Sequence, residues 1–112
     1  MKFGRIILFF LLLNIMSFGF SQRIISFSGY EWVVKNSSES RVGPGNNIFS
    51  ATTENVFVNS SNQLVLQITR YKSKWHCAEV HTKESFGYGT YIFEIDADLQ
   101  TLNKNIVFGL FT

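Results

Sequence analysis

The chain has 112 residues, so it holds one domain at most, near the small end of the usual size range. Ten Lys and Arg residues stand against eight Asp and Glu residues, and this balance excludes the strongly basic footprint of a typical nucleic-acid-binding domain. The single cysteine, Cys77, excludes a framework of internal disulfides and argues against a structural zinc site, which draws on several Cys or His ligands.

Residues 1–21 have the pattern of a secretory signal peptide. Lys2 and Arg5 precede an apolar run over residues 6–20, and the small residues Gly19 and Ser21 stand at its end. The run is shorter than the roughly 20 apolar residues that a membrane-spanning helix needs, so an uncleaved anchor is the weaker alternative. We expect cleavage after Ser21 and a secreted protein, extracellular or periplasmic, that has no membrane contact afterwards. Residues 22–112 then carry eight basic and eight acidic residues and are formally neutral.

The mature part shows short apolar runs with a period of two, separated by Ser, Asn and Gly clusters, which predicts an all-β domain. Alternation around Trp32 predicts the first strand, and a loop follows at residues 43–47, where Gly and Pro cluster. Residues 56–58 and 64–68 flank a polar turn and predict a hairpin. Further strands are expected at residues 75–83, 88–97 and 106–111.

Half-buried strands and twelve phenylalanines predict an antiparallel β-sandwich, or a concanavalin-like jelly roll. Only five or six strands are predicted where a small sandwich has about seven. The last predicted strand has no return partner, which would leave an unpaired edge and exposed apolar surface. We therefore expect the sandwich to be incomplete in this chain.

Three acids, Glu94, Asp96 and Asp98, occupy alternate positions of a predicted strand and would share one face. Paired carboxylates are the groups that glycoside hydrolysis requires. The alternative is an ordinary amphipathic strand, in which Tyr91, Phe93 and Ile95 face the core and the acids face water. Spacing alone favours this second interpretation.

A second candidate cluster lies at residues 76–81. Cys77, Glu79 and His81 would share one face of a strand, while His76 points to the other. Three mixed ligands on one strand make a poor tetrahedral metal site, and no third group orients a Cys-His nucleophile pair. We expect a packed cysteine and a polar histidine on the concave face of the sheet.

Several of these segments resemble the N-terminal half of glycoside hydrolase family 16, in particular its bacterial lichenase-like β-glucanases. The resemblance covers nearly all of residues 27–112 and depends on the order and spacing of its motifs. They are Trp32, Asn55-Val56, Leu64-Val65-Leu66, Cys77-Ala78-Glu79-Val80, Phe86-Gly87-Tyr88-Gly89-Thr90-Tyr91 and Ile106-Val107-Phe108-Gly109-Leu110-Phe111-Thr112.

The resemblance implies retaining hydrolysis of a β-glucan-type polysaccharide by two carboxylates. The catalytic strand of the family follows the segment that Thr112 ends, so the resemblance places the catalytic acids beyond residue 112. Glu94, Asp96 and Asp98 fall one strand too early and are interpreted as non-catalytic. Residues 22–112 would be the N-terminal part of the domain, and without its acids the piece itself would be inactive.

The resemblance also implies substrate-binding positions. Glu79 matches a glutamate of the sugar-binding cleft, and His81 stands where the lichenase-like enzymes commonly have arginine. Phe111 matches an aromatic residue of the cleft, and Asn47 lies in a loop that supplies an asparagine near the substrate. The partner cysteine of the family corresponds to Ala51, so Cys77 is expected to be a free, buried thiol.

The resemblance brings no cofactor beyond a structural calcium ion, known in the family, whose ligands cannot be assigned here. We expect a monomer that binds polysaccharide and does not bind nucleic acid. Two alternatives remain open. The chain could be a non-catalytic, lectin-like module on the same scaffold, or an inactive truncated product.

Overall fold

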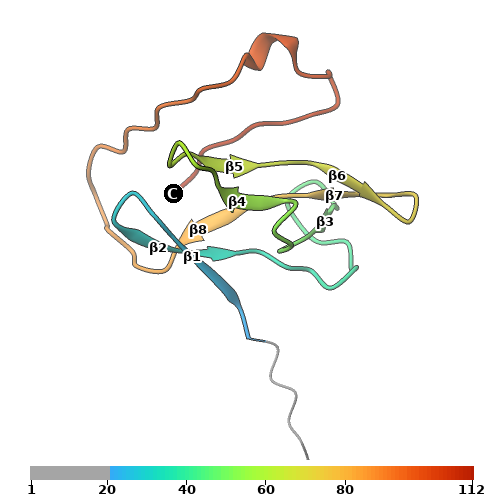
Figure 1. Ribbon diagram of the computed structural model, residues 1–112, viewed down its shortest axis with the longest axis horizontal. Helices are drawn as coiled ribbons and strands as arrows, with labels where there is room; N and C mark the ends of the chain where they lie inside the picture. Colours follow the sequence, from blue (N-terminus) through green and yellow to red (C-terminus); the bar gives the residue numbers. More distant parts are fainter. Residues whose placement is uncertain (1–20) are drawn as a thin grey trace, which may run out of the picture.

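The computed structural model describes residues 21–112, so the predicted signal segment lies outside the described residues except for Ser21. The described part has eight short strands and one 3₁₀ turn (Figure 1). Their bounds are β1 Arg23–Phe27, β2 Tyr30–Val34, β3 Ile48–Phe49, β4 Val56–Val58, β5 Leu64–Leu66, β6 Thr69–Tyr71, β7 Lys74–Cys77, β8 Val80–Thr82 and η1 Leu99–Thr101. The prediction of an all-β chain is confirmed.

The strands form three small sheets with the orders β1-β2-β8, β3-β7-β6 and β4-β5. Neighbouring strands run antiparallel, except that β3 and β7 pair in parallel through Ile48 with His76 and Phe49 with Cys77. The parallel pair departs from the predicted antiparallel arrangement. It is possible because a long connection separates the two strands in sequence.

Two tight hairpins follow from local turn chemistry. Ser28 and Gly29 both have positive φ, 53° and 79°, and they join β1 to β2 in a two-residue turn whose twist suits antiparallel strands. The predicted hairpin of residues 56–58 and 64–68 is confirmed, because β4 pairs with β5 across a polar turn, although β5 ends at Leu66. The turn is closed by a 2.9 Å hydrogen bond that the Asn59 amide donates to the Gln63 carbonyl.

The predicted strand over residues 75–83 is wrong as a single element. It divides into β7, which pairs with β3 and β6, and β8, which pairs with β2 in another sheet. Ala78 and Glu79 lie between the two strands. The alternation of apolar and polar residues continues across residues 78 and 79. This alternation depends only on which face of the strand each side chain occupies, and it does not indicate which strand is the pairing partner.

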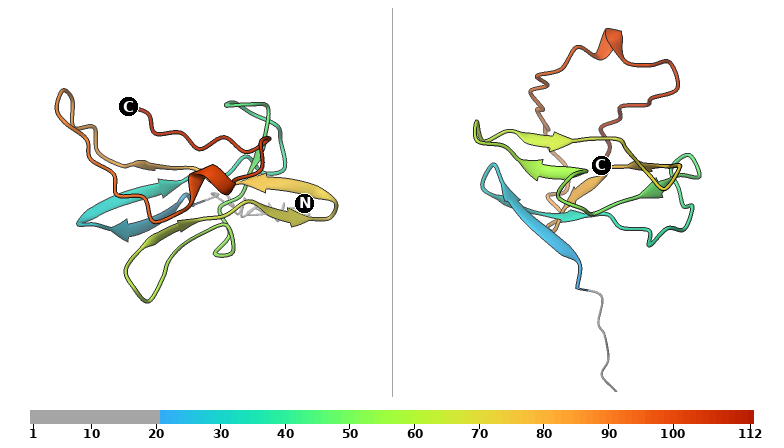
Figure 2. Two further views of the ribbon diagram at one scale, coloured as in Figure 1. Left: turned by 90° about the horizontal axis from the view of Figure 1, so that it is seen from above. Right: turned by 45° about the vertical axis from the view of Figure 1, so that its right-hand side comes forward.

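The strands predicted at residues 88–97 and 106–111 are absent from the structure. The segment after Lys83 runs as a long arch away from the sheets and contains only η1 (Figures 1 and 2). Tyr91, Phe93 and Ile95 are each more than 40% exposed, so the prediction that they face the core is wrong. No strand of the described residues pairs with this segment, and an extended chain without a partner gains no ladder of hydrogen bonds.

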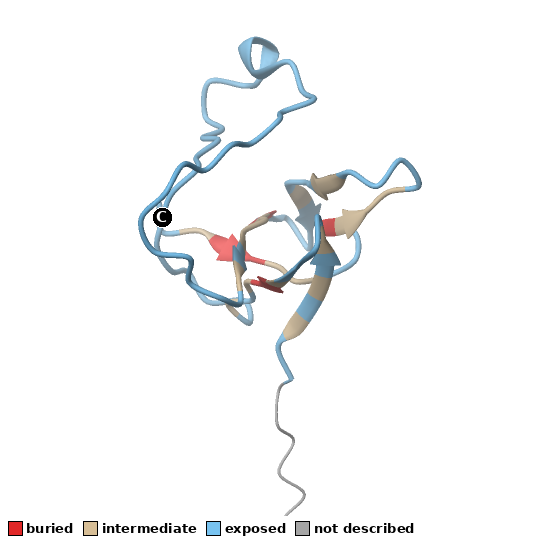
Figure 3. Ribbon diagram, turned by 90° about the vertical axis from the view of Figure 1, so that its left-hand side faces the viewer, coloured by how far each residue is buried: buried red, intermediate tan, exposed pale blue. Residues whose placement is uncertain are grey.

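The buried core is small, and its apolar members come from one strand of each of the three sheets, namely β2, β3 and β4 (Figure 3). Its apolar members are Val33, Val34, Ile48, Phe49 and Val56. Asn55 and His76 are buried with them, and among residues 21–112 no buried polar side-chain atom lacks a hydrogen-bond partner. Within the same residues no helix is long and apolar enough to cross a membrane.

Candidate functional site

Glu79, a predicted site residue, lies in the two-residue link between β7 and β8. The Lys35 amide, just after β2, donates a 3.0 Å hydrogen bond to the Glu79 carbonyl, which extends the β2–β8 ladder by one pair. Lys35 and Glu79 therefore face each other across the ladder. The paired residues Val33 and His81 lie two positions away on the same face.

An ion pair fixes Lys35 and Glu79 together. The Lys35 ammonium donates to both carboxylate oxygens of Glu79, at 3.1 and 3.0 Å, and to the Gly43 carbonyl at 2.7 Å. It also lies 4.2 Å from the centre of the Phe49 ring, within range of a cation–π contact. An ammonium group has three donors, and these three oxygens use all of them. The hydrogen bonds of Lys35 therefore connect the end of β2 to the start of β8 and to the loop at residues 43–47.

A groove of about 340 Å³ opens beside this pair. Lys35, Val33 and His81 contribute one wall, and the start of β1 with the loop after β2 contributes the others. The groove is lined by Ser21, Gln22, Arg23, Val33, Val34, Lys35, Asn36, Ser38, Ala51 and His81. The lining contains neither a carboxylate nor a Phe, Tyr or Trp ring, so its chemistry is that of amide, hydroxyl, imidazole and cationic groups beside apolar side chains.

Several contacts hold the groove walls in place. The Arg23 guanidinium donates to the carbonyls of Ala51 and Thr52 at 2.9 and 3.0 Å, which closes one end. The Asn36 side chain accepts a 3.0 Å hydrogen bond from the Ser38 amide and so forms a local turn. With Lys35 fully bonded, the groups left to contact a ligand are His81 and the polar side chains of this wall.

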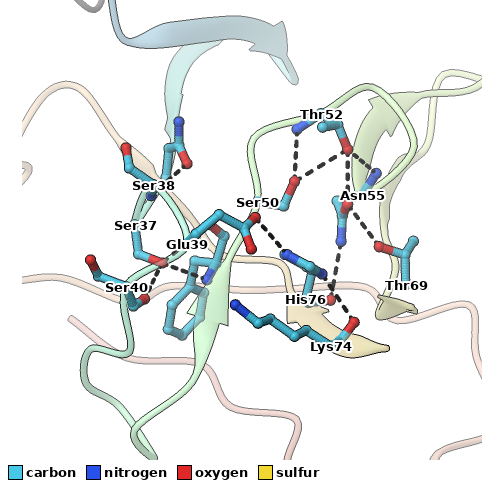
Figure 4. Close-up of polar contacts among 12 residues, drawn as sticks. Ser37, Ser38, Glu39, Ser40, Ser50, Thr52, Asn55, Thr69, Lys74 and His76 are labelled. Carbon is cyan, nitrogen blue, oxygen red and sulfur yellow. Dashed lines mark hydrogen bonds and ion pairs between the residues drawn. The ribbon is translucent and has the colours of Figure 1, made fainter. Parts of the chain in front are cut away.

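A buried polar network is centred on Asn55 and His76 (Figure 4). The Asn55 amide nitrogen donates to the carbonyls of Gln67 and His76, at 3.0 and 3.1 Å, and its oxygen accepts from the hydroxyls of Thr52 and Thr69. These four bonds join the segments before β4, after β5 and at β7. A polar core residue that is fully bonded in this way fixes the relative position of the strands.

His76 extends the network to the loop that carries the groove wall. Its ring is 3% exposed, and Nε2 lies 2.8 Å from a carboxylate oxygen of Glu39. Nδ1 lies 3.2 Å from the Lys74 carbonyl. Nearby, the Ser37 hydroxyl donates to the Ser40 carbonyl at 2.6 Å and accepts from the Phe49 amide at 2.9 Å. Asn36 and Ser38 thus belong to a loop that is tied to two strands.

A smaller hollow of about 210 Å³ lies near the β1–β2 turn. Gly29, Tyr30, Glu31, Glu84 and Phe86 line it, and Tyr30 meets Phe86 edge-on with their ring centres 5.0 Å apart. It contains none of the four predicted substrate-binding residues. The larger groove is therefore the better candidate site.

Of the four predicted substrate-binding residues, only His81 lines the groove, while Glu79 and the loop that contains Asn47 connect to the groove through Lys35. His81 lines the groove, Glu79 fixes the lysine in its wall, and Asn47 closes the loop whose Gly43 carbonyl receives that lysine. The side-chain amide of Asn47 donates a 3.1 Å hydrogen bond to the Pro44 carbonyl. Phe111 is 65% exposed and is not part of the groove lining.

The three acids of residues 94–98 lie in the arch and not on a strand. Asp96 accepts a 2.8 Å hydrogen bond from the Gln63 side chain, and Asp98 caps η1 by accepting from the Gln100 amide at 3.0 Å. Glu94, like its two neighbours, is exposed. The contacts of Asp96 and Asp98 are those of surface turn residues, and none of the three acids lines the groove.

Cys77 is a free thiol, as expected, but it is half-buried rather than buried. Burial raises the pKa of the Cys77 thiol above its ordinary value of 9.0. A thiol of this kind stays protonated at neutral pH and is a poor nucleophile.

Within residues 21–112, no group of three or more His, Cys, Asp or Glu side chains is placed to hold a metal ion. Calcium takes about six to eight oxygen ligands, several of them from carboxylates. These residues therefore offer no fit for the calcium ion that the family resemblance implies.

The sequence patterns missed Lys35 and the polar wall at Arg23, Asn36 and Ser38. A lysine after a strand and serines in a polar run have the same pattern as solvent-exposed turn residues. One signal was available. Lys35 lies two residues after Val33 in an alternating segment, so the two side chains are on the same face of the strand. Its partner Glu79 lies 44 residues further along the chain, and no local pattern joins the two.

No family model matches the chain, and no curated protein or solved structure matches it either. The resemblance to glycoside hydrolase family 16 therefore depends on the motifs themselves.

Proposed function

We propose that residues 22–112 form the N-terminal part of a jelly-roll sandwich of the glycoside hydrolase family 16 type, in a secreted protein. In this proposal the groove beside Lys35 is one wall of a cleft that binds a β-glucan-like polysaccharide. The complete domain hydrolyses O-glycosyl bonds by a retaining mechanism, with two carboxylates about 5–5.5 Å apart that lie beyond residue 112.

The observation that carries the proposal is the groove itself. Its volume of about 340 Å³ lies at the lower end of the range of roughly 300–1,000 Å³ that is usual for small-molecule sites. Polar groups without formal negative charge lie beside apolar side chains, and such a lining suits the hydroxyls of a neutral sugar. Glu79 keeps its carboxylate on Lys35, so its role is to position the wall, while His81 is free to contact the sugar.

Binding to soluble mixed-linkage β-glucan in affinity gel electrophoresis tests the proposal. We expect retardation of the purified chain, and we expect His81→Ala to weaken binding roughly three- to tenfold, the value of one hydrogen bond to a neutral group. Glu94→Gln is the matched control, since it changes an exposed side chain in the arch and should leave binding unchanged. Absence of retardation, or an equal loss in both variants, would count against the groove as the sugar site.

A second function, carbohydrate binding without catalysis, is favoured by the lack of any carboxylate in the groove lining. Release of reducing ends from the same glucan separates the two functions. We expect none from residues 22–112. Release by a longer chain that continues past residue 112 supports the hydrolase, and binding without release supports the lectin-like module. An inactive truncated product would bind nothing and would show no cooperative unfolding.

A further inference from the structure

The β6–β7 hairpin carries a cluster of cationic and aromatic residues outside the groove. Its tip, residues 70–75, is Arg70-Tyr71-Lys72-Ser73-Lys74-Trp75, and we name this segment the basic hairpin. Tyr71 pairs with Lys74 across a two-residue turn in which Lys72 and Ser73 both have positive φ, 47° and 63°. A turn of this kind matches the twist of the strands, so the hairpin presents its side chains from a defined backbone. It extends from one end of the sheets in Figure 1.

Positive charge is concentrated on the basic hairpin although the mature chain is neutral. Three of its six residues are cationic, and residues 69–78 contain no acid. The rest of residues 22–112 has five basic and eight acidic residues. Within residues 21–112, ion pairs involve Lys35, His76 and Lys83, and none involves a cation of the basic hairpin. The positive charge there is therefore available to an outside partner.

Two exposed aromatic rings accompany these cations. Trp75 is 61% exposed, and the Arg70 guanidinium lies 5.5 Å from its ring centre. Tyr71 is 58% exposed, with the Lys72 ammonium 5.3 Å from its ring centre. Arg70 pairs with Trp75 across the ladder, so the guanidinium and the indole share one face of the hairpin. A large ring left in water beside a cation is the arrangement that receives a sugar ring together with its anionic substituent.

We propose that the basic hairpin binds an acidic polysaccharide, one that carries carboxylate or sulfate groups. The Trp75 ring stacks on a sugar ring, while Arg70 and Lys72 bind the anionic groups of that sugar and its neighbours. A bilayer surface fits less well, because the two-residue turn that ends the hairpin, Lys72-Ser73, is polar and offers no apolar side chain to enter the headgroup region ahead of Tyr71 and Trp75. No residue of the basic hairpin lines the groove, so this site is separate from the proposed cleft and independent of it.

Titration of the full chain with dextran sulfate and with polygalacturonate, followed by Trp fluorescence, tests the proposal. We expect saturable binding to both, no comparable response to neutral dextran, and weakening as salt screens the charges. The triple variant R70Q/K72Q/K74Q should bind roughly tenfold more weakly or worse, since it removes all three cations that would pair with the anionic groups. Trp75→Ala, followed by affinity electrophoresis, should also weaken binding, and Trp75→Phe should retain most of it.

Lys104→Gln is the matched control, because it removes an exposed cation outside the basic hairpin and should leave binding unchanged. The substituted side chains are exposed, and circular dichroism shows whether each variant keeps its strands. Equal binding by the triple variant would overturn the site. Tighter binding to single-stranded DNA, or to vesicles of equal parts phosphatidylcholine and phosphatidylglycerol, would overturn the choice of polysaccharide. Failure of the groove variants on neutral β-glucan leaves each of these outcomes unaffected.

Discussion

Individual side chains in this protein act mainly through what they hold in place. The Lys35 ammonium donates all three of its hydrogen bonds to Glu79 and Gly43. The Asn55 side-chain amide donates to two carbonyls, one in the segment after β5 and one in β7. Both residues connect segments that are far apart in sequence. In a small core such connections replace part of the apolar burial that larger domains use.

Asn55→Ala should strongly destabilise the chain. The substitution leaves the buried His76 carbonyl without this donor and removes the acceptor of two threonine hydroxyls, which we expect to cost roughly 2–4 kcal/mol in the free energy of unfolding. Urea unfolding followed by Trp fluorescence measures the change. Asn105→Ala, at an exposed position in the arch, is the control and should have little effect. Similar losses in both variants would contradict the role of the network.

The Cys77 thiol predicts a pH dependence in the alkaline range. Its pKa is raised in the folded state by burial, so folding favours the neutral thiol. The stability from this group is fully present below its ordinary pKa of 9.0. It is lost as pH rises through the folded-state pKa, because the unfolded chain gives up its proton first. The free energy of unfolding should therefore fall more steeply above pH 9.0 in the wild type than in Cys77→Ala. Parallel pH profiles would show that the thiol is not desolvated.

At the scale of elements, the turn residues determine which hairpins form, and the neighbouring strands determine which sheet each strand joins. The turn residues Ser28 and Gly29 set the register of β1 against β2 from Arg23 with Val34 to Phe27 with Tyr30. The crossing at Ala78 and Glu79 shows the other case. One alternating run serves two sheets there, because different strands lie beside its two halves.

Gly29→Ala should lower the stability of the β1–β2 hairpin by about 1 kcal/mol, the cost of a left-handed backbone for a residue with a Cβ. No heavy atom lies within 4 Å of the added Cβ, so the backbone alone accounts for the effect. Thermal unfolding measures it. Gly89→Ala is the matched control, since that Cβ also meets open space and the residue does not have positive φ. A larger loss at Gly89 would refute this explanation of the turn.

Residues 21–112 divide into a part held by paired strands, up to Thr82, and the arch that follows it. Sheets and core lie before residue 83, while the arch places apolar side chains such as Ile92 and Val107 in water, at 84% and 91% exposure. Backbone hydrogen bonds within the arch are local, such as the 2.8 Å bond from the Ile106 amide to the Asn103 carbonyl. Regions with few buried contacts and few long-range bonds open at low free energy.

Limited chymotrypsin digestion should therefore cut the arch first. We expect early cleavage after aromatic residues of 86–111, while Trp32 and Phe49 within the sheets serve as internal controls and resist. Mass spectrometry of the fragments identifies the cut sites. Early cleavage after Trp32 or Phe49 would show that the sheets are no more stable than the arch.

The sequence by itself determined the all-β class, the hairpin at residues 56–66, the turn-forming loop at residues 43–47 and the free Cys77. These features depend on local patterns, namely alternation, turn chemistry and a residue count. Only the tertiary structure decided that residues 75–83 divide between two sheets, that residues 88–97 and 106–111 lie unpaired, and that Lys35 meets Glu79 beside a groove. The physical reason is the same in each case, since a strand or an ion pair needs a partner and the partner comes from a distant part of the chain.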